Sequence, residues 1–257
     1  MLDNWRTMIG FFSGAMVPAL TIFTLTTQLV QGQDAASANV SAASWSATAS
    51  LATRYISRGL DLTNGPVAPE VSGEYRFPSG WYVNAVATKI DYFDMNAEVD
   101  GNTGMRGSLG AVHYDLGLYY YYYPGRAGAN LHASFAEFGT RLSWGSGAVI
   151  PVFELFLSND YFFGAGRSVF FNAGADVSLP GTITASARYG YTHVADNFAF
   201  SYPNYANWML YATRSFDRWD VSAQLTDTSI DHNHCLDENR CSLKMTLRVT
   251  RNFGGAP

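Results

Sequence analysis

Charged residues are scarce in this sequence: only 14% of its 257 residues are Asp, Glu, Lys or Arg, against roughly 25% in ordinary soluble domains. No basic cluster is present and the formal net charge is −5, so nucleic acid is not expected as a partner. After the first thirty residues there is no long apolar run, which argues against a bundle of transmembrane helices. The low charge therefore needs another explanation.

The one long apolar stretch, MIGFFSGAMVPALTIFTLTTQLV (residues 8–30), follows Arg6, the single basic residue of that region. Small residues that could be cleaved by a signal peptidase come next, as in Ala36-Ser37-Ala38. This order is typical of a secretory signal peptide. We therefore predict a signal peptide over residues 1–38 and a mature chain over residues 39–257. An uncleaved anchor helix is the alternative, because the stretch is longer than usual.

The mature part alternates apolar with small or polar side chains over segments of ten to thirteen residues. In the stretch DLGLYYYYYPG (residues 115–125), one face would carry Leu116, Leu118, Tyr120 and Tyr122, and the other Asp115, Gly117, Tyr119 and Tyr121. Strands of soluble sandwiches are usually about five or six residues long. Longer strands with one apolar face are typical of transmembrane β-barrels, which meet lipid on one side and water on the other.

Turn signals divide these segments in a regular rotation of short turns and longer connections. Short turns are predicted at residues 78–80, 107–110, 145–147, 180–181 and 217–218, and longer connections near 57–66, 93–97, 124–131, 159–167, 194–206 and 229–241. This rhythm is that of outer-membrane barrels, whose periplasmic turns are short and whose outer loops are long. The predicted fold is all-β, a transmembrane antiparallel up-and-down β-barrel of about 12 strands with both termini on the periplasmic side.

Aromatic residues gather at both ends of the predicted strands. One end would carry Trp45, Phe77, Trp81, Trp144, Phe216 and Trp219, and the other Tyr55, Tyr92, Tyr122, Tyr191 and Trp208. Two aromatic bands one strand-length apart match the two interfaces of a bilayer. Bulky rings that plug the ends of a soluble core are the alternative explanation.

Several stretches resemble a known family. SATASLATRYISRGLDLTNGPVAPEVSGEYRFPSGWYVNAVAT (residues 46–88), YYYYYPG, SNDYF and LPGTITASARYGY are similar to the TorF-type porin family of Gram-negative bacteria, with Arg58-Gly59 and Tyr-Pro-Gly as the most specific motifs. The resemblance extends from about residue 45 to Phe253. It implies export to the cell outer membrane of a Gram-negative bacterium and a barrel with pore function, and it supplies no catalytic residue.

The inward face carries charges of both signs. The residues predicted to line the pore are Arg54, Glu70, Glu74, Arg76, Glu98, Asp100, Arg106, Asp115, Glu137, Arg141, Glu154, Asp176, Arg188, Asp220, Lys244 and Arg248. In a wide barrel such groups line water, and in a narrow one they pair across the lumen and plug it. We predict a narrow porin-like channel for passive or weakly selective diffusion of small solutes or ions. Its other expected partners are the lipid bilayer with its lipopolysaccharide and, as a possibility, further copies of the chain in a homo-oligomer.

Alternative functions remain open. A barrel that does not conduct, with a structural or surface-receptor role, leaves no signature in sequence. An outer-membrane lipid hydrolase could use His132 and Ser134, which lie two residues apart at a strand end, as base and nucleophile. We favour a protein that is not an enzyme and has no cofactor.

The segment DHNHCLDENRC (residues 231–241) holds the only two cysteines of the chain. A disulfide between Cys235 and Cys241 is the prediction for an exported protein. A metal site built from Asp231, His232, His234 and Cys235 is the alternative, since His and Cys suit zinc or copper.

Overall fold

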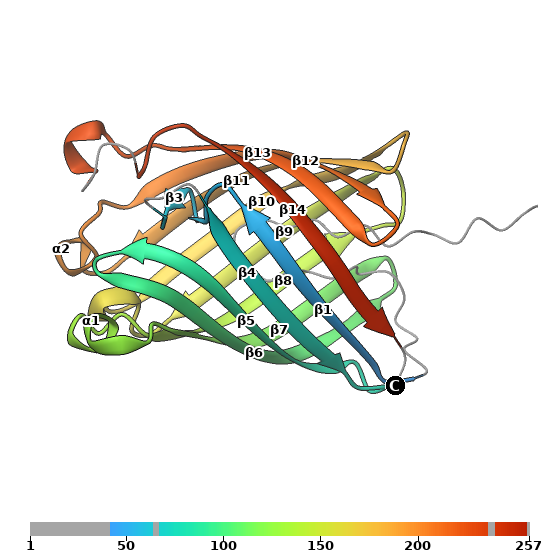
Figure 1. Ribbon diagram of the computed structural model, residues 1–257, viewed down its shortest axis with the longest axis horizontal. Helices are drawn as coiled ribbons and strands as arrows, with labels where there is room; N and C mark the ends of the chain where they lie inside the picture. Colours follow the sequence, from blue (N-terminus) through green and yellow to red (C-terminus); the bar gives the residue numbers. More distant parts are fainter. Residues whose placement is uncertain (1–41, 64–66, 236–239, 256–257) are drawn as a thin grey trace, which may run out of the picture.

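Twelve strands form one closed antiparallel barrel in the computed structural model, which describes residues 42–63, 67–235 and 240–255. The order around the barrel is β1-β14-β13-β12-β11-β10-β9-β8-β7-β6-β5-β4 (Figure 1). The predicted all-β barrel and its number of strands are confirmed. The predicted signal peptide, residues 1–38, lies outside the described residues.

The barrel strands are β1 (Ser44–Ala52), β4 (Ala68–Arg76), β5 (Trp81–Tyr92), β6 (Met95–Leu109), β7 (Val112–Tyr122), β8 (Phe135–Trp144), β9 (Val149–Ser158), β10 (Ser168–Leu179), β11 (Ile183–Val194), β12 (Tyr205–Phe216), β13 (Trp219–Thr228) and β14 (Lys244–Gly255). The connections contain a small hairpin, β2 (Ile56–Ser57) with β3 (Leu60–Asp61), and the short helices α1 (Gly125–Asn130), η1 (Phe162–Gly164), α2 (Asn197–Phe200) and η2 (His232–His234). No helix within the described ranges is long and apolar enough to cross a bilayer.

Closure joins the first strand to the last. β1 pairs with β14 from Trp45 opposite Gly255 to Ala52 opposite Arg248, and on its other side with β4. Every barrel strand thus has two hydrogen-bonded neighbours, and the sheet has no open edge. A closed sheet satisfies its backbone groups internally, as a lipid environment requires.

The two ends of the barrel differ. At one end, which we call the short-turn end, two to four residues join consecutive strands, at positions 77–80, 110–111, 145–148, 180–182 and 217–218. The other end, the long-loop end, carries the small hairpin and the short helices, at the left of Figure 1. The predicted short turns are confirmed here, although Gly107 belongs to β6 and the turn itself lies at 110–111.

One predicted long connection is wrong. The strands β5 and β6 are joined by two residues only, Phe93 and Asp94, both with positive φ (49° and 61°). Two such residues fit the twist of a tight hairpin turn. Asp tolerates this conformation, and the Phe93 ring packs edge-on against Phe163 with centroids 5.1 Å apart. This tertiary contact is absent from the local sequence pattern.

The two faces of the strands follow the predicted alternation. On β7, Leu118 is 63% exposed on the outside of the barrel while the neighbouring Tyr119 is 7% exposed. The same alternation holds on β9, β11, β13 and β14. The outside is therefore apolar and the inside polar and aromatic, which is the inverse of a soluble barrel.

The aromatic band at the short-turn end is confirmed, since Trp45, Phe77, Trp81, Trp144, Phe216 and Trp219 all have exposed side chains. At the long-loop end the prediction is wrong for Tyr55 and Tyr92, which are fully buried inside the barrel. Tyr92 occupies an inward position of β5, and Tyr55 belongs to the segment that leads into the small hairpin. Tyr122 and Trp208 do lie on the outside.

If the apolar outside face meets lipid, the cost of a charge on it should depend on how deep the residue lies in the bilayer. Leu210, in the middle of β12, and Leu179, at the short-turn end of β10, are similarly exposed (49% and 45%). If this face meets lipid, Leu210→Arg should lower the free energy of unfolding in vesicles by about 2–4 kcal/mol, and Leu179→Arg by about 0–1 kcal/mol. Urea unfolding in lipid vesicles measures both. Equal costs at the two depths would contradict a membrane-spanning barrel.

Candidate functional site

The predicted pore residues lie on the inner side of the barrel wall. Arg54 is the exception: it lies in the connection after β1, and its side chain is 39% exposed. The others lie on strands, at positions whose neighbours along the strand point outward, and most of their side chains are buried. They are Glu70, Glu74, Arg76, Glu98, Asp100, Arg106, Asp115, Glu137, Arg141, Glu154, Asp176, Arg188, Asp220, Lys244 and Arg248. That they line a conducting path stays a prediction.

One group of charges is centred on Arg106 of β6. Its guanidinium binds Asp115 on the adjacent β7 at 2.6 Å and Glu74 on β4 at 2.7 Å. The same guanidinium lies over the ring of Tyr82 at 3.9 Å from the centroid, and the Tyr82 hydroxyl donates to Asp115 at 2.7 Å. Arg76 completes the group at 3.6 Å from Glu74.

A second group connects four neighbouring strands. Arg141 of β8 pairs with Glu154 of β9 and, at 3.5 Å, with Asp176 of β10. Arg188 of β11 binds Asp176 at 2.6 Å. Asn172 donates to the second oxygen of Glu154 at 2.9 Å. Each charge in this group thus has an opposite charge on the adjoining strand, as buried charges require.

Two further wall charges are bound locally. Arg248 of β14 binds Glu70 of β4 at 2.8 Å, and Asp220 accepts from Asn252 at 2.7 Å. All of these contacts join adjacent strands or strands separated by one other. The pairs therefore follow the wall and leave the centre of the lumen uncrossed, which differs from the cross-lumen pairing considered for a narrow barrel.

One arginine that was not among the predicted pore residues does cross the lumen. Arg58 and Gly59 form the two-residue tip of the β2–β3 hairpin, with φ of 49° and 88°. A turn of this kind needs positive φ at both central residues. The tip packs against the ends of β12 and β13: a Cβ on Gly59 would lie 2.7 Å from Cγ2 of Thr228 and 2.9 Å from Cβ of Asn207. Glycine is therefore required there by conformation and by space.

Arg58 is buried against the opposite wall, where its guanidinium pairs with Glu137 of β8. Three rings surround it: Phe170 at 4.6 Å, Tyr161 at 5.2 Å and Phe156 at 5.7 Å from centroid to Cζ. These distances lie within the range of cation–π attraction. Burial acts to lower the pKa of Arg58, but the negative charge of Glu137 outweighs it and the pKa is raised. The arginine therefore remains charged.

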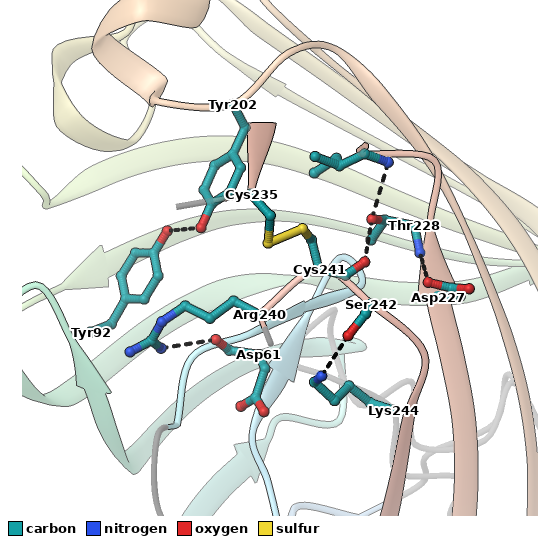
Figure 2. Close-up of a disulfide and its surroundings, with 11 residues drawn as sticks. Asp61, Tyr92, Tyr202, Asp227, Thr228, Cys235, Arg240, Cys241, Ser242 and Lys244 are labelled. Carbon is teal, nitrogen blue, oxygen red and sulfur yellow. Dashed lines mark hydrogen bonds between the residues drawn. A yellow bond between two sulfur atoms is a disulfide. The ribbon is translucent and has the colours of Figure 1, made fainter. Parts of the chain in front are cut away.

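The base of the hairpin is fastened at several points. The Asp61 side chain accepts from Arg54 at 2.7 Å and from the Thr63 amide at 2.9 Å. Its backbone amide donates to the carbonyl of Arg240 at 2.8 Å, and Arg240 donates back to the Asp61 carbonyl at 3.1 Å. The loop between β13 and β14 is thus hydrogen-bonded directly to the hairpin (Figure 2).

The predicted disulfide is confirmed within this loop. Cys235 and Cys241 are bonded, with an S–S distance of 2.00 Å (Figure 2). The Cys241 carbonyl accepts from the Thr228 hydroxyl at 2.6 Å, and Cys241 is buried in the aromatic cluster of the long-loop end. Because Cys235 is bonded to Cys241, it is not a thiolate ligand for a metal, and no metal-binding group of side chains occurs in the described part of the chain.

The hairpin and the loops fill the long-loop half of the lumen. A continuous cluster of buried side chains extends from Ile90 and Tyr92 on one wall through Leu60 and Leu62 of the hairpin segment to Phe170 on the other wall. The cavity that remains beside Arg58 has a volume of about 30 Å³, enough for one or two water molecules. Around Arg58, the described residues thus leave space for little more than water.

The residues of the hydrolase alternative do not form a catalytic pair. His132 is exposed, with a positive φ of 50°, and the Ser134 hydroxyl accepts from the Tyr123 amide at 3.2 Å. Within the described ranges no hydrogen bond joins the two side chains. The geometry therefore lends this alternative no support.

Sequence comparison identifies a family for this chain. The family described as "Bacterial protein of unknown function (Gcw_chp)" matches residues 35–253. No curated protein matches the chain. The resemblance to the TorF-type porins therefore stays a prediction.

Solved structures with the same fold include two porins. The KdgM porin superposes with a TM-score of 0.55 over 82% of this chain and 99% of its own, at 6% identity. The NanC porin superposes with a TM-score of 0.53 over 83% of this chain and 99% of its own, at 7% identity. At such low identity the likeness shows the barrel fold alone.

Alanine substitutions at two glycines test how closely the hairpin tip packs against the barrel wall. Gly59 and Gly145 share a φ of 88°, but a Cβ on Gly145 would meet no atom within 4 Å. Replacement by alanine should cost both sites about 1–2 kcal/mol for the left-handed backbone. Gly59→Ala should cost about 1–3 kcal/mol more, because it overpacks the contact with Thr228 and Asn207. Urea unfolding of both variants in vesicles measures the difference, and equal losses would mean that the tip does not pack against β12 and β13.

Proposed function

The chain belongs to the Gcw_chp family of bacterial proteins of unknown function, and we propose that it is a porin-like channel of the outer membrane for small solutes or ions. The observation that carries this proposal is the distribution of polarity: a closed barrel with an apolar outside and ionised groups of both signs inside. An apolar outside suits lipid, and a polar inside suits water. The porin fold of the two solved structures is consistent with it.

The orientation follows from the same logic. We place the short-turn end in the periplasm and the long-loop end outside the cell, as is usual for outer-membrane barrels. The lipid bilayer with its lipopolysaccharide would contact the apolar face, and a homo-oligomer would form through that face. Export by a signal peptide over residues 1–38 belongs to this proposal. No catalytic residue and no cofactor form part of it.

The β2–β3 hairpin would limit conduction through this channel. It would close the long-loop half, since Arg58 pairs with Glu137 on the opposite wall, whereas the wall charges nearer the short-turn end leave the centre of the barrel uncrossed. We therefore expect low conductance while the hairpin is seated and higher conductance when it leaves.

A barrel with a structural or receptor role is the second candidate. The observation that favours it is the wall-to-wall packing of aromatic side chains in the long-loop half, since a filled lumen does not conduct. Channel recording separates the two candidates.

Removal of the hairpin tests conduction directly. A variant in which residues 56–61 are replaced by a Gly/Ser linker should show several-fold higher single-channel conductance than the wild type in planar bilayers. The reason is that the linker lacks the side chains that cross the lumen. A barrel refolded with the same linker in place of residues 197–200, at the same end, serves as the control. Silence of all three proteins would leave the structural or receptor barrel.

The wall charges should set the ion preference. Arg141→Ala leaves Glu154 with no cation among its described contacts and Asp176 with Arg188 alone, so the channel should become more selective for cations. Reversal potentials under a salt gradient measure the change. The shift should fade toward 1 M salt, where the screening length is about 3 Å.

Arg214→Ala is the matched control, because Arg214 is exposed on the outside of β12. It removes the same charge without touching the lumen and should leave the reversal potential unchanged. An unchanged potential in a conducting Arg141→Ala variant would mean that Arg141 does not line the conducting path.

A further inference from the structure

The barrel wall opposite the hairpin carries a compact site that is occupied by Arg58 of the same chain. Glu137 of β8, Phe156 of β9, Phe170 of β10 and Tyr161 of the connection between them surround the Arg58 guanidinium. We call these four residues the cation cage. None of them belongs to the segment that carries Arg58, so the cage is part of the barrel wall and the arginine is a separate piece that enters it.

The backbone of the wall shapes the cage. Gly139 follows Glu137 by two residues on the same inward face, and it lies directly opposite Phe156, which in turn lies opposite Phe170. A Cβ on Gly139 would lie only 2.5 Å from Cε1 of Phe156. The missing side chain therefore lets the Phe156 ring lie against the wall beside the Glu137 carboxylate.

The chemistry of the cage selects its occupant. A carboxylate attracts a positive charge, and the faces of aromatic rings attract cations, guanidinium groups above all. Oε1 of Glu137 and Nη1 of Arg58 are buried and make no hydrogen bond within the described residues, so the cage has acceptor capacity beyond that used by Arg58. If Arg58 leaves, Glu137 remains as a buried carboxylate without a cation, which is strongly unfavourable.

We propose that the cation cage is a binding site for solutes that carry a guanidinium or primary ammonium group, with Arg58 as its built-in occupant. Such a solute competes with Arg58 for Glu137 and the three rings, and it stabilises the barrel with the hairpin displaced. The cage itself does not depend on conduction. In the proposed channel, its occupancy by a solute would oppose closure by the hairpin.

The test uses the Arg58→Ala variant of the full mature barrel in detergent micelles, with propylguanidinium as the probe. The empty cage should bind the probe in the millimolar range, and the midpoint of thermal unfolding should rise with its concentration because the probe binds the folded state. Propylurea, which is neutral but similar in shape, should have no such effect. The wild type should not respond in this range, because the tethered Arg58 has a high effective concentration at the cage.

Two variants control for the site. Arg58→Ala with Glu137→Gln should bind propylguanidinium about tenfold more weakly or worse, since a buried charge-assisted contact is lost. Arg54→Ala removes an arginine of the same segment that binds Asp61 at 2.7 Å and leaves the cage occupied, so it should behave as the wild type does. The proposal would be overturned if propylguanidinium did not raise the unfolding midpoint of Arg58→Ala, or if propylurea raised it equally. An equal response of the variant that also carries Glu137→Gln would overturn it as well.

Poor folding of Arg58→Ala would itself provide a readout. Propylguanidinium present during refolding should then raise the yield of folded barrel, whereas propylurea should not. A yield that neither compound raises, or that both raise equally, would overturn the proposal. These measurements do not depend on ion conduction. If the barrel shows no conductance but still gives a Glu137-dependent response to propylguanidinium, the cage is supported and the channel function is ruled out.

Discussion

Closure of the sheet determines which side chains of the barrel face outward and which face inward. Once β1 pairs with both β14 and β4, every strand has an outside and an inside, and the period of two fixes which side chains face each. The outside takes the apolar residues, so the polar and charged ones are confined to a narrow interior. Buried charges need partners there, and the ion pairs of the described wall residues are of two kinds: pairs along the wall, and one pair that crosses the lumen.

The sequence predicted the part of this arrangement that is local. Alternation over one strand is a property of neighbouring residues, so the faces of β7 could be assigned from Leu118 and Tyr119 without a structure. The predicted disulfide was local as well, since Cys235 and Cys241 are six residues apart. The β5–β6 turn could not be predicted, because the left-handed Phe93 in it packs against the ring of Phe163, which comes much later in the chain.

The role of Arg58 lay beyond local patterns for the same reason. Its partner Glu137 is 79 residues away, and a charged residue in a polar loop is ordinarily solvated. The signal that was present is the dipeptide Arg58-Gly59 between two short β-prone pairs, which is compatible with a tight hairpin turn. That pattern indicates a turn but not its direction. The direction follows only from tertiary contacts: Arg58 pairs with Glu137, and Gly59 packs against Thr228 and Asn207.

The two kinds of pair have different mechanical consequences. Arg141 and Glu154 lie on strands that the sheet already holds together, so breaking this pair changes the charge of the lumen without releasing any segment. Arg58 and Glu137 join a hairpin to a wall with which it shares no strand pairing. Breaking that pair frees a segment while leaving a carboxylate that needs a new cation. In the proposed channel, the wall pairs would thus set the ion preference. The hairpin pair would make closure depend on whether the entering solute carries a cationic group that can replace Arg58.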